Sequence, residues 1–341
     1  MTRRYGDGVT RRQVLAGGAA AGAALFLRGR APAFGQQTLE KVRMSCWSNR
    51  IAEQANIYAA EEFGWFKEQG VDFEFVPGQG GGDALRHVLA GNAAIAMTNV
   101  EAMFFALDQG AKLVSIYNVY PQNVFNVVSL KRSTVKGPLD LKGHRVGVYS
   151  MASGTRHNLM YILAASGMSE KDIEVVAVGI FNFAPLMEGK VIATAATDTG
   201  LWDAQQKGLG EVDVISARDY LNVPTDIFVT TGELYKAKPD LLRRFLKAYK
   251  KGTEYAMANL EKAAALSAKY AIDGRDNPQR NVEHLRLRMI ASVSEGTKRN
   301  GLGWHDMDVI ELAARRFQEL GLVTSKIDVA AAVTNRFVKE I

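Results

Sequence analysis

Apolar and polar residues alternate along the VDFEFV run at residues 71–76, and this period of two predicts a strand. In residues 51–62 the apolar side chains recur at helical spacing instead, which predicts a helix with one buried face. The same succession of a β-type run and a helical stretch continues through residues 41–117 and returns through residues 145–215. Such alternation is typical of an α/β fold, and we expect its strands to be mainly parallel.

Two extended segments, at about residues 120–130 and 222–231, separate these two series of units. We therefore predict two lobes, with the chain running from the first to the second and back. Lobe 1 comprises residues 41–122 and 226–341, and lobe 2 comprises residues 123–225. The C-terminal part is nearly all helical by its pattern, and we expect its helices to pack mostly on lobe 1. A ligand cleft is expected between the lobes, at the carboxyl ends of the strands.

The N-terminal segment has the layout of an export signal. Arg11 and Arg12 precede an uncharged, Ala/Gly-rich stretch at residues 14–27, which is shorter than the ~20 residues that span a bilayer. Small residues ending at Gly35 provide a cleavage site. We predict that residues 1–35 are a twin-arginine-type signal peptide, cleaved near Gly35, and that the mature protein is soluble in the periplasm. A disordered basic tail followed by a short helix is the alternative.

The charge of the chain is concentrated in this segment. The 341 residues carry a net charge of +6, but residues 1–35 contain six arginines and one aspartate and account for five of these charges. The remaining chain is nearly neutral and lacks the net positive field that drives binding to a phosphate backbone, so we expect no nucleic-acid partner. Hydrophobic residues make up 47% of the chain, which is typical of a globular protein. We expect a monomer.

Residues that could catalyse a reaction or bind a metal do not cluster in the sequence. Cys46 is the single cysteine, so neither an internal disulfide nor a Cys-x-x-Cys metal pair can form. No Gly-x-Ser-x-Gly motif occurs. The five histidines are scattered without a His-x-x-x-His pair: His87, His144, His157, His284 and His305. We therefore expect no catalytic residue, no metal and no cofactor.

A glycine-rich turn, GQGGGD at residues 78–83, lies between a predicted strand and a predicted helix. Gly81 and Gly82 would let the backbone approach a ligand closely, and the start of the helix would offer unpaired N–H groups. We expect Asp83 to cap this helix. The alternative is a plain flexible turn. Because no Gly-Lys-Ser/Thr follows, the turn is not the phosphate loop of a nucleotide-binding protein.

Other candidate ligand contacts come directly after predicted strands, where they would line the cleft. They are Trp47 and Asn49 after the first strand, Thr98 and Asn99 after a later strand of lobe 1, and Asp198 and Trp202 after a strand of lobe 2. Trp47 could stack on a planar part of a ligand, or it could be a core tryptophan. Asp198 could bind a ligand amine or amide, or it could cap the following helix.

Four stretches resemble the nitrate/sulfonate/taurine type of periplasmic binding protein, including its relatives of the thiamine-pyrimidine-synthesis fold. They are YAAEEFGWF at residues 58–66 with GVDFEFV at 70–76, DALRHVLAGNAAIA at 83–96, LDLKGHRVGV at 139–148 and the less distinctive MEGKV at 187–191. Together they span about residues 41–231. After Val191 the family usually has an Asp-Ala pair, where this chain has Ile192-Ala193. The resemblance therefore does not specify the ligand.

The resemblance implies a type II periplasmic binding protein fold and a non-enzymatic role as the substrate-binding component of an ABC importer, with a membrane permease as partner. The ligand would be a small polar solute or anion of the sulfonate, nitrate or carboxylate class. A pyrimidine or another nitrogen heterocycle is one alternative, and an exported enzyme of the pyrimidine-synthase-like fold is another. Such an enzyme would carry an iron-binding, cysteine-rich motif, which is missing because Cys46 stands alone.

The resemblance also implies where a polar or anionic group of the ligand is held. It points to the strand-to-helix junction SMASGT of lobe 2, where Ser153, Gly154 and Thr155 would contribute hydroxyl and backbone N–H groups. Arg156 and His157 follow on the first helical turn, and either could face the cleft or the solvent. We include His157 among the candidate ligand contacts.

Overall fold

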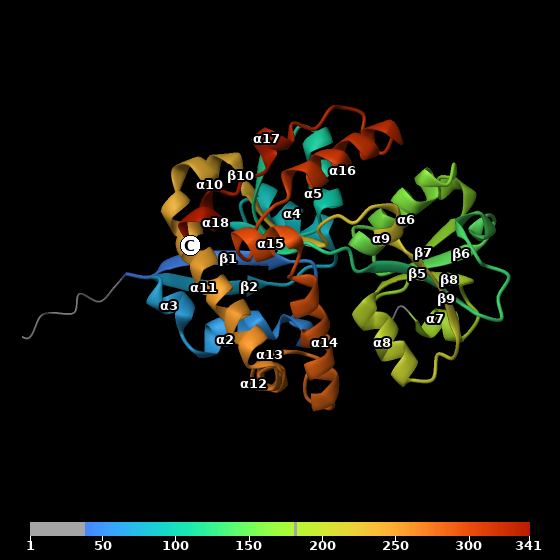
Figure 1. The fold of residues 1–341 in the computed structure, drawn as a ribbon, viewed down its shortest axis with the longest axis horizontal. Coiled ribbons are helices and arrows are strands. Elements are labelled where there is room, and N and C mark those ends of the chain that lie inside the picture. Colours follow the sequence, from blue (N-terminus) through green and yellow to red (C-terminus); the bar gives the residue numbers. More distant parts are fainter. Residues whose placement is uncertain (1–37, 181–182) are drawn as a thin grey trace, which may run out of the picture. The chain divides into compact units, whose positions relative to one another are not determined.

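The computed structural model describes residues 38–180 and 183–341, so the predicted signal peptide and its cleavage site near Gly35 lie outside the described residues. Strands and helices alternate between residues 40 and 231, which confirms the predicted α/β class (Figure 1). The strands form two sheets of five strands each.

The first sheet has the strand order β2-β1-β3-β10-β4. Its strands are β1 (Glu40–Cys46), β2 (Val71–Val76), β3 (Ile95–Thr98), β4 (Leu113–Tyr120) and β10 (Asp226–Thr231). β1 pairs in parallel with both β2 and β3, as expected where helices connect successive strands. All eight residues of β4 are buried, so this strand is covered on both faces.

The second sheet has the strand order β7-β6-β8-β5-β9. Its strands are β5 (Phe125–Leu130), β6 (Arg145–Val148), β7 (Glu174–Ala177), β8 (Ala193–Thr197) and β9 (Val212–Ser216). β6 pairs in parallel with β7 and β8. The second sheet therefore repeats the arrangement of the first.

The two strands at the crossings, β5 and β10, run antiparallel to their neighbours. β5 pairs antiparallel with β8 and β9, and β10 pairs antiparallel with β3 and β4. The mainly parallel pattern predicted from the sequence is wrong at these two strands. The reason is that each of them is entered from the other sheet, so the chain runs through it in the opposite direction from strands reached through a local helix.

Helices cover the faces of both sheets. Those between the strands are α2 (Ala55–Glu62), α3 (Trp65–Glu68), α4 (Gly81–Leu89), α5 (Val100–Asp108), α6 (Gly154–Ala165), α7 (Ala184–Met187), α8 (Asp198–Gln206) and α9 (Ala217–Tyr220), with the 3-10 turns η1 (Ala52–Gln54), η2 (Pro138–Leu141) and η3 (Glu170–Asp172). Within the described ranges, no helix combines the length and the apolar character that crossing a membrane would require.

The C-terminal part is helical, as its pattern predicted. Its helices are α10 (Gly232–Ala237), α11 (Pro239–Ala258), α12 (Leu260–Ala265), α13 (Ser267–Tyr270), α14 (Pro278–Ala291), α15 (Glu295–Asn300), α16 (Met307–Glu319), α17 (Val329–Ala332) and α18 (Arg336–Glu340). Near the end of the chain, the helical pattern is interrupted between α17 and α18. The chain is extended at Val333, which forms a bridge with Ser115 of β4.

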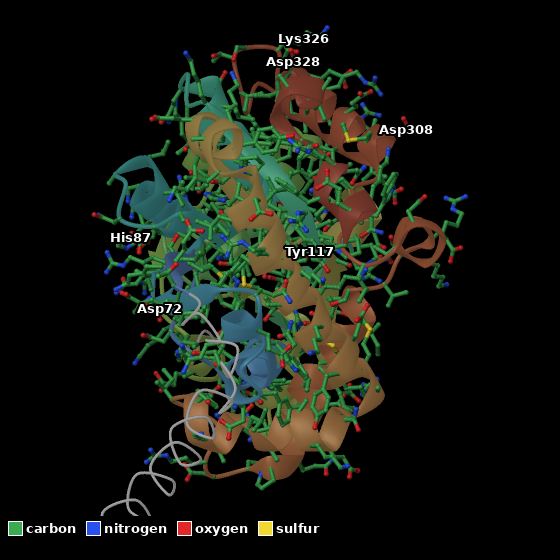
Figure 2. The ribbon with its side chains drawn as sticks, turned by 90° about the vertical axis from the view of Figure 1, so that its left-hand side faces the viewer. Asp72, His87, Tyr117, Asp308, Lys326 and Asp328 are labelled. Carbon is green, nitrogen blue, oxygen red and sulfur yellow. The ribbon has the colours of Figure 1, made fainter. Side chains whose placement is uncertain are left out.

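Two layers of side chains cover the first sheet. On one face, α11 packs on α2 and α3 (Figure 1). There the ring of Phe228 meets the rings of Phe245 and Tyr249 edge to face. On the other face, α4 and α5 are covered by α16, where Phe104 meets Phe317. Figure 2 shows Tyr117 of β4 in the interior, whereas exposed residues such as Asp72 point outward. The second sheet has its own apolar layers around α6 and around α7 with α8.

Candidate functional site

A cavity of about 240 Å³ lies where the loops after the strands of both sheets meet. Its wall is lined by Trp47, Ile51, Glu53, Gly80, Gly81, Asn99, Phe125, Tyr149, Ser153, Gly154, Thr155, Ile180, Thr197, Thr199, Gly200, Asp203, Thr225, Asp226, Ile272, Asp273, Arg280, His284 and Arg288. The loops that follow β1, β3, β6 and β8 contribute to it, together with the start of β10 and one face of α14. This position matches the rule that α/β proteins bind ligands at the carboxyl ends of their strands.

Half of the candidate ligand contacts named from the sequence lie in this wall. They are Trp47, Gly81, Asn99, Ser153, Gly154 and Thr155. The other half, Asn49, Gly82, Thr98, His157, Asp198 and Trp202, is not part of the lining. The assignment of any of them to ligand binding stays a prediction.

The candidates outside the wall have other partners. The Thr98 hydroxyl donates to the Gly81 carbonyl at 2.8 Å, and the Gly82 N–H donates to the Ala152 carbonyl at 3.0 Å. The His157 ring lies edge-on against another ring, that of Phe105. Burial lowers the pKa of His157 to about 3, with a further contribution from Arg156, so this ring is neutral.

The remaining three lie at the surface or at the edge of the site. Asn49 is exposed to solvent. The Trp202 ring meets the His284 ring edge to face, and Asp198 forms an ion pair with Arg288. The helix after β8 begins at Asp198, with the Thr197 side chain as its N-cap, so Asp198 is not the cap of this helix.

Steric contacts explain why the turn before α4 consists of glycines. α4 begins at Gly81, with Gly80 at the N-cap in a left-handed conformation of φ 116°. A side chain at Gly80 would collide with the Ala152 backbone, and one at Gly81 would collide with Asn99. Asp83 lies inside the first turn, where it accepts from the Gln79 N–H at 2.9 Å, so the expectation that Asp83 is the cap is wrong. The glycines let the start of α4 approach the loop after β6.

The hydroxyls at the junction before α6 are engaged within their own loop. The Ser153 side chain caps α6 and donates to the Ser150 carbonyl at 2.6 Å. Thr155 Oγ1 accepts from the Tyr149 N–H at 2.9 Å and lies 2.7 Å from Ser153 Oγ. Thr155 therefore fixes the loop in addition to facing the cavity.

Thr155→Val is expected to lower the free energy of unfolding of the ligand-free protein by about 1–3 kcal/mol, because the Tyr149 N–H loses its acceptor. Thr155→Ser keeps an oxygen at that position and should stay close to the parent. Urea denaturation of the three proteins without ligand measures the difference. If the valine variant is as stable as the parent, the hydroxyl has no structural role.

Two buried carboxyl groups line the cavity and were not identified from the sequence. Asp226, the first residue of β10, accepts from Trp47 Nε1 at 3.0 Å, and Glu53 of η1 accepts from the Thr199 hydroxyl at 3.0 Å. Both residues are only 4% exposed. Burial raises the pKa of Asp226 well above its usual range, and the Glu53 carboxyl raises it further. The cavity therefore holds a carboxyl group that lacks compensation by a nearby cation.

The positive charges at the cavity are already paired. Arg280 donates to Asp203 and to Asp273, and Arg288 donates to Asp198. Thus, among the described residues, both arginines of the wall are neutralised by carboxylates. No group of three or more His, Cys, Asp or Glu side chains in residues 38–180 and 183–341 is placed to hold a metal ion. This balance suits a ligand that donates hydrogen bonds better than one that brings negative charge.

The basic residues of α14 have a spacing in the sequence that indicates one face of a helix. Arg280, His284 and Arg288 are spaced by four residues, which places them on one face of a helix. Charged residues at this spacing usually form a solvent-exposed face. Here the face is turned toward the cavity, and Arg288 is 1% exposed.

A polar network next to the cavity links α5 to α6. Glu101 is 1% exposed and accepts from Asn99 Nδ2 at 2.7 Å and from Asn158 Nδ2 at 2.9 Å. Burial raises the pKa of Glu101 from 4.5 to about 7, against the lowering effect of its backbone and amide hydrogen bonds. The folded protein holds this proton more tightly than the unfolded chain does. The contribution of Glu101 to the free energy of unfolding is therefore fully present below pH 4.5 and is lost as the pH rises through 7.

Glu101→Gln is expected to remove this pH dependence. The variant should gain stability relative to the parent between pH 5 and pH 8, by on the order of 3 kcal/mol. The glutamine amide can be accommodated because Asn99 Oδ1 lacks a partner and becomes an acceptor if that amide turns over. Denaturant unfolding at several pH values measures the difference, and a difference that does not change with pH would show that Glu101 does not titrate in this range.

The sequence is similar to a binding protein and to a group of enzymes. The riboflavin-binding protein RibY of Chloroflexus aurantiacus is 27% identical over 321 residues, covering 89% of this chain and 87% of RibY. The 4-amino-5-hydroxymethyl-2-methylpyrimidine phosphate synthase THI5 of Saccharomyces cerevisiae is 24% identical over 224 residues, covering 61% of this chain and 64% of THI5.

Solved structures share the fold. A protein from Bordetella bronchiseptica has a TM-score of 0.72 at 20% identity, covering 88% of this chain and 96% of its own. The periplasmic aliphatic sulphonate binding protein SsuA of Escherichia coli has a TM-score of 0.64 at 18% identity, covering 88% of this chain and 99% of SsuA. The predicted two-lobed fold of a periplasmic binding protein is thereby confirmed. The NMT1/THI5-like family model matches residues 51–263, which is more than half of the chain, and the chain belongs to this family.

Proposed function

We propose that this chain is an exported, monomeric solute-binding protein that captures a small molecule between two lobes and delivers it to the membrane permease of an ABC importer. The observation that carries the proposal is the cavity lined from the strand ends of both sheets. Lobe 1 would comprise residues 41–122 and 226–341, and lobe 2 residues 123–225. Contacts from both lobes would select the ligand as the lobes close.

We further propose that the ligand is a planar nitrogen heterocycle with N–H donors, the alternative left open by the sequence, and not a sulfonate, nitrate or carboxylate. Trp47, Phe125 and Tyr149 supply aromatic surface, and Asp226 and Glu53 supply buried acceptors. An anion would meet these carboxyl groups with both arginines of the wall already paired. RibY is named as a riboflavin-binding protein, and riboflavin belongs to the heterocycle class.

An enzymatic role has less support. THI5 is named as a synthase, but this chain spans 64% of its length. Burial raises the pKa of Cys46 to about 12, and the residue is fully buried, so its thiol is unsuited to serve as a nucleophile or as a metal ligand. We therefore propose a binding protein and not an enzyme.

A thermal-shift screen tests the ligand class. The purified protein is heated with riboflavin, an aminopyrimidine, uracil, taurine, an alkanesulfonate, nitrate and acetate in separate wells. We expect a heterocycle to raise the melting temperature, because a ligand that binds only the folded state stabilises it. A larger shift with a sulfonate or nitrate would overturn the proposed class. A protein that none of the seven shifts at millimolar concentration would contradict it as well.

Export is tested on the full chain expressed in a Gram-negative host. We expect the mature protein in the periplasmic fraction, with an N-terminus near Gln36, as the paired Arg11 and Arg12 predict. N-terminal sequencing reads the cleavage site. A protein that stays in the cytoplasm and begins at Met1 would contradict the proposed export.

A further inference from the structure

Helix α14 presents a basic face to two aspartates of α8. Arg280, His284 and Arg288 lie at successive four-residue steps on α14, which packs on η1 and α12 beside the first sheet. Asp198 and Asp203 lie on α8, which packs beside the second sheet. The ion pairs between the two helices therefore join the elements of one sheet to those of the other.

Asp203 receives most of these bonds. Arg280 Nε lies 2.8 and 2.9 Å from the two carboxylate oxygens of Asp203, and Arg280 Nη2 lies 2.8 Å from Oδ2. His284 Nε2 lies 2.8 Å from Asp203 Oδ1. Partial burial opposes ionisation, but the hydrogen bonds from His284 and Arg280 outweigh it and lower the pKa of Asp203 to about 2. The carboxylate is thus ionised and held by two side chains of α14.

Arg280 is also held in position by a residue outside α8. Arg280 Nη1 donates to Asp273 Oδ2 at 2.9 Å, and the other oxygen of Asp273 accepts from the Ala52 N–H at 2.8 Å. The guanidinium is therefore already aimed at α8 before Asp203 arrives. If the two helices separate, Arg280 keeps Asp273 as a carboxylate partner, and Arg288, which loses Asp198, keeps Glu53 at 3.7 Å. The contact between α14 and α8 can therefore break and re-form.

We propose that Asp203 and the Arg280–His284 face of α14 form a latch that holds the two lobes closed and so raises the affinity for the ligand. The inference rests on the proposed function, because a latch has an effect only if the lobes move. A ligand that binds the closed form has an apparent dissociation constant equal to its intrinsic value divided by the closed fraction. Loosening the latch lowers that fraction. Because Asp203, Arg280 and His284 also line the cavity, the effect on the lobes is measured first without ligand.

The test measures lobe separation without any ligand. Leu89 of α4 and Leu139 of η2 are exposed, and each is replaced by cysteine for spin labelling. The buried Cys46 does not compete for the label. Pulsed EPR then gives the distance distribution between the labels. Asp203→Arg places a cation against Arg280, and we expect a broader distribution with a changed mean distance. Adding Arg280→Asp together with Asp273→Asn restores opposite charges without setting two carboxylates side by side, and we expect a return toward the parent distribution.

Asp213 provides the matched control. Its side chain is 18% exposed against 20% for Asp203, and it pairs with Lys131 and Lys136 at 2.6 Å each, all three lying beside the second sheet. Asp213→Arg should therefore leave the distance distribution unchanged. If the Asp203→Arg protein does not fold by circular dichroism, Asp203→Asn is used, with a smaller change in the same direction.

Two results would overturn the latch: an Asp203 variant with the parent distribution, or an Asp213 variant that shifts it equally. If the thermal-shift screen fails while Asp203→Arg shifts the distribution and the charge swap restores it, the latch stands and only the proposed ligand class falls. With a ligand from the screen, Asp203→Asn should weaken binding by roughly threefold to thirtyfold. An unchanged dissociation constant would contradict the effect on affinity.

Discussion

The Asp226→Asn protein is expected to bind the proposed heterocyclic ligand roughly tenfold to a hundredfold more weakly than the parent, and yet to be more stable without ligand at pH 7. The asparagine keeps the shape of the side chain and an oxygen for the Trp47 N–H. It loses one of the two carboxyl oxygens, and leaving a buried ligand N–H without its acceptor costs about 1–3 kcal/mol. Calorimetry with the most strongly stabilising compound of the screen measures the affinity.

The gain in stability follows from the raised pKa of Asp226. A carboxyl group whose pKa is raised by folding contributes its stability at low pH and loses it as the pH rises. Asparagine does not titrate, so the advantage of the variant should shrink toward pH 4 and grow toward pH 7. A variant that binds the heterocycle as tightly as the parent would show that Asp226 does not contact the ligand. A variant less stable than the parent at pH 7 would contradict the account of its burial.

Arg288→Met should lower the free energy of unfolding by about 3–5 kcal/mol. Methionine fills part of the space of the arginine stem, but Asp198 loses its ion pair and Glu53 loses a guanidinium whose Nε lies 3.7 Å away. Removing one partner from a buried pair leaves the other charge without compensation, and Glu53 cannot turn to solvent because it is 4% exposed.

Arg286→Met is the matched control, since Arg286 lies on the same helix two residues away. Its side chain is 46% exposed and pairs with Glu283 on the surface, so its loss should cost less than about 1 kcal/mol. Urea unfolding of both variants gives the comparison. Equal losses for the two arginines would mean that burial at Arg288 adds nothing to its contribution.

Local patterns in the sequence predicted the fold and part of the cavity wall. Period-two and helical patterns predicted the alternating elements, and the glycines at Gly81 and Gly154 marked strand-to-helix junctions that do line the cavity. These predictions succeeded because a strand, its turn and its helix are formed by neighbouring residues. His157, three residues after Gly154, was placed in the cleft by proximity in sequence, but its helical position turns it into the core against Phe105.

The charged part of the wall could not be predicted in the same way. Trp47 and Asp226 are 179 residues apart, and Asp198 and Arg288 are 90 apart, so each pair exists only after both sheets are assembled. An aspartate is common at the start of a strand, so the position of Asp226 before an apolar run does not indicate a cavity residue. Its burial beside Glu53 follows from the antiparallel entry of β10 into the first sheet, which no local pattern specifies.

The position of β10 also constrains the order in which the chain can fold during synthesis. β10 lies between β3 and β4 in the first sheet. Strands β1, β2 and β3, within residues 40–98, can therefore pair as they leave the ribosome, whereas β4 can join the sheet only after β10 has been synthesised. In the described part of the chain, β4 pairs with β10 and forms bridges with Gly303 and Val333, all of which are made later. Assembly of the first sheet therefore depends on contacts distant in sequence, which form slowly, and it finishes only when nearly the whole chain exists. A translocation route that accepts folded cargo, as the paired arginines predict, would suit such a chain.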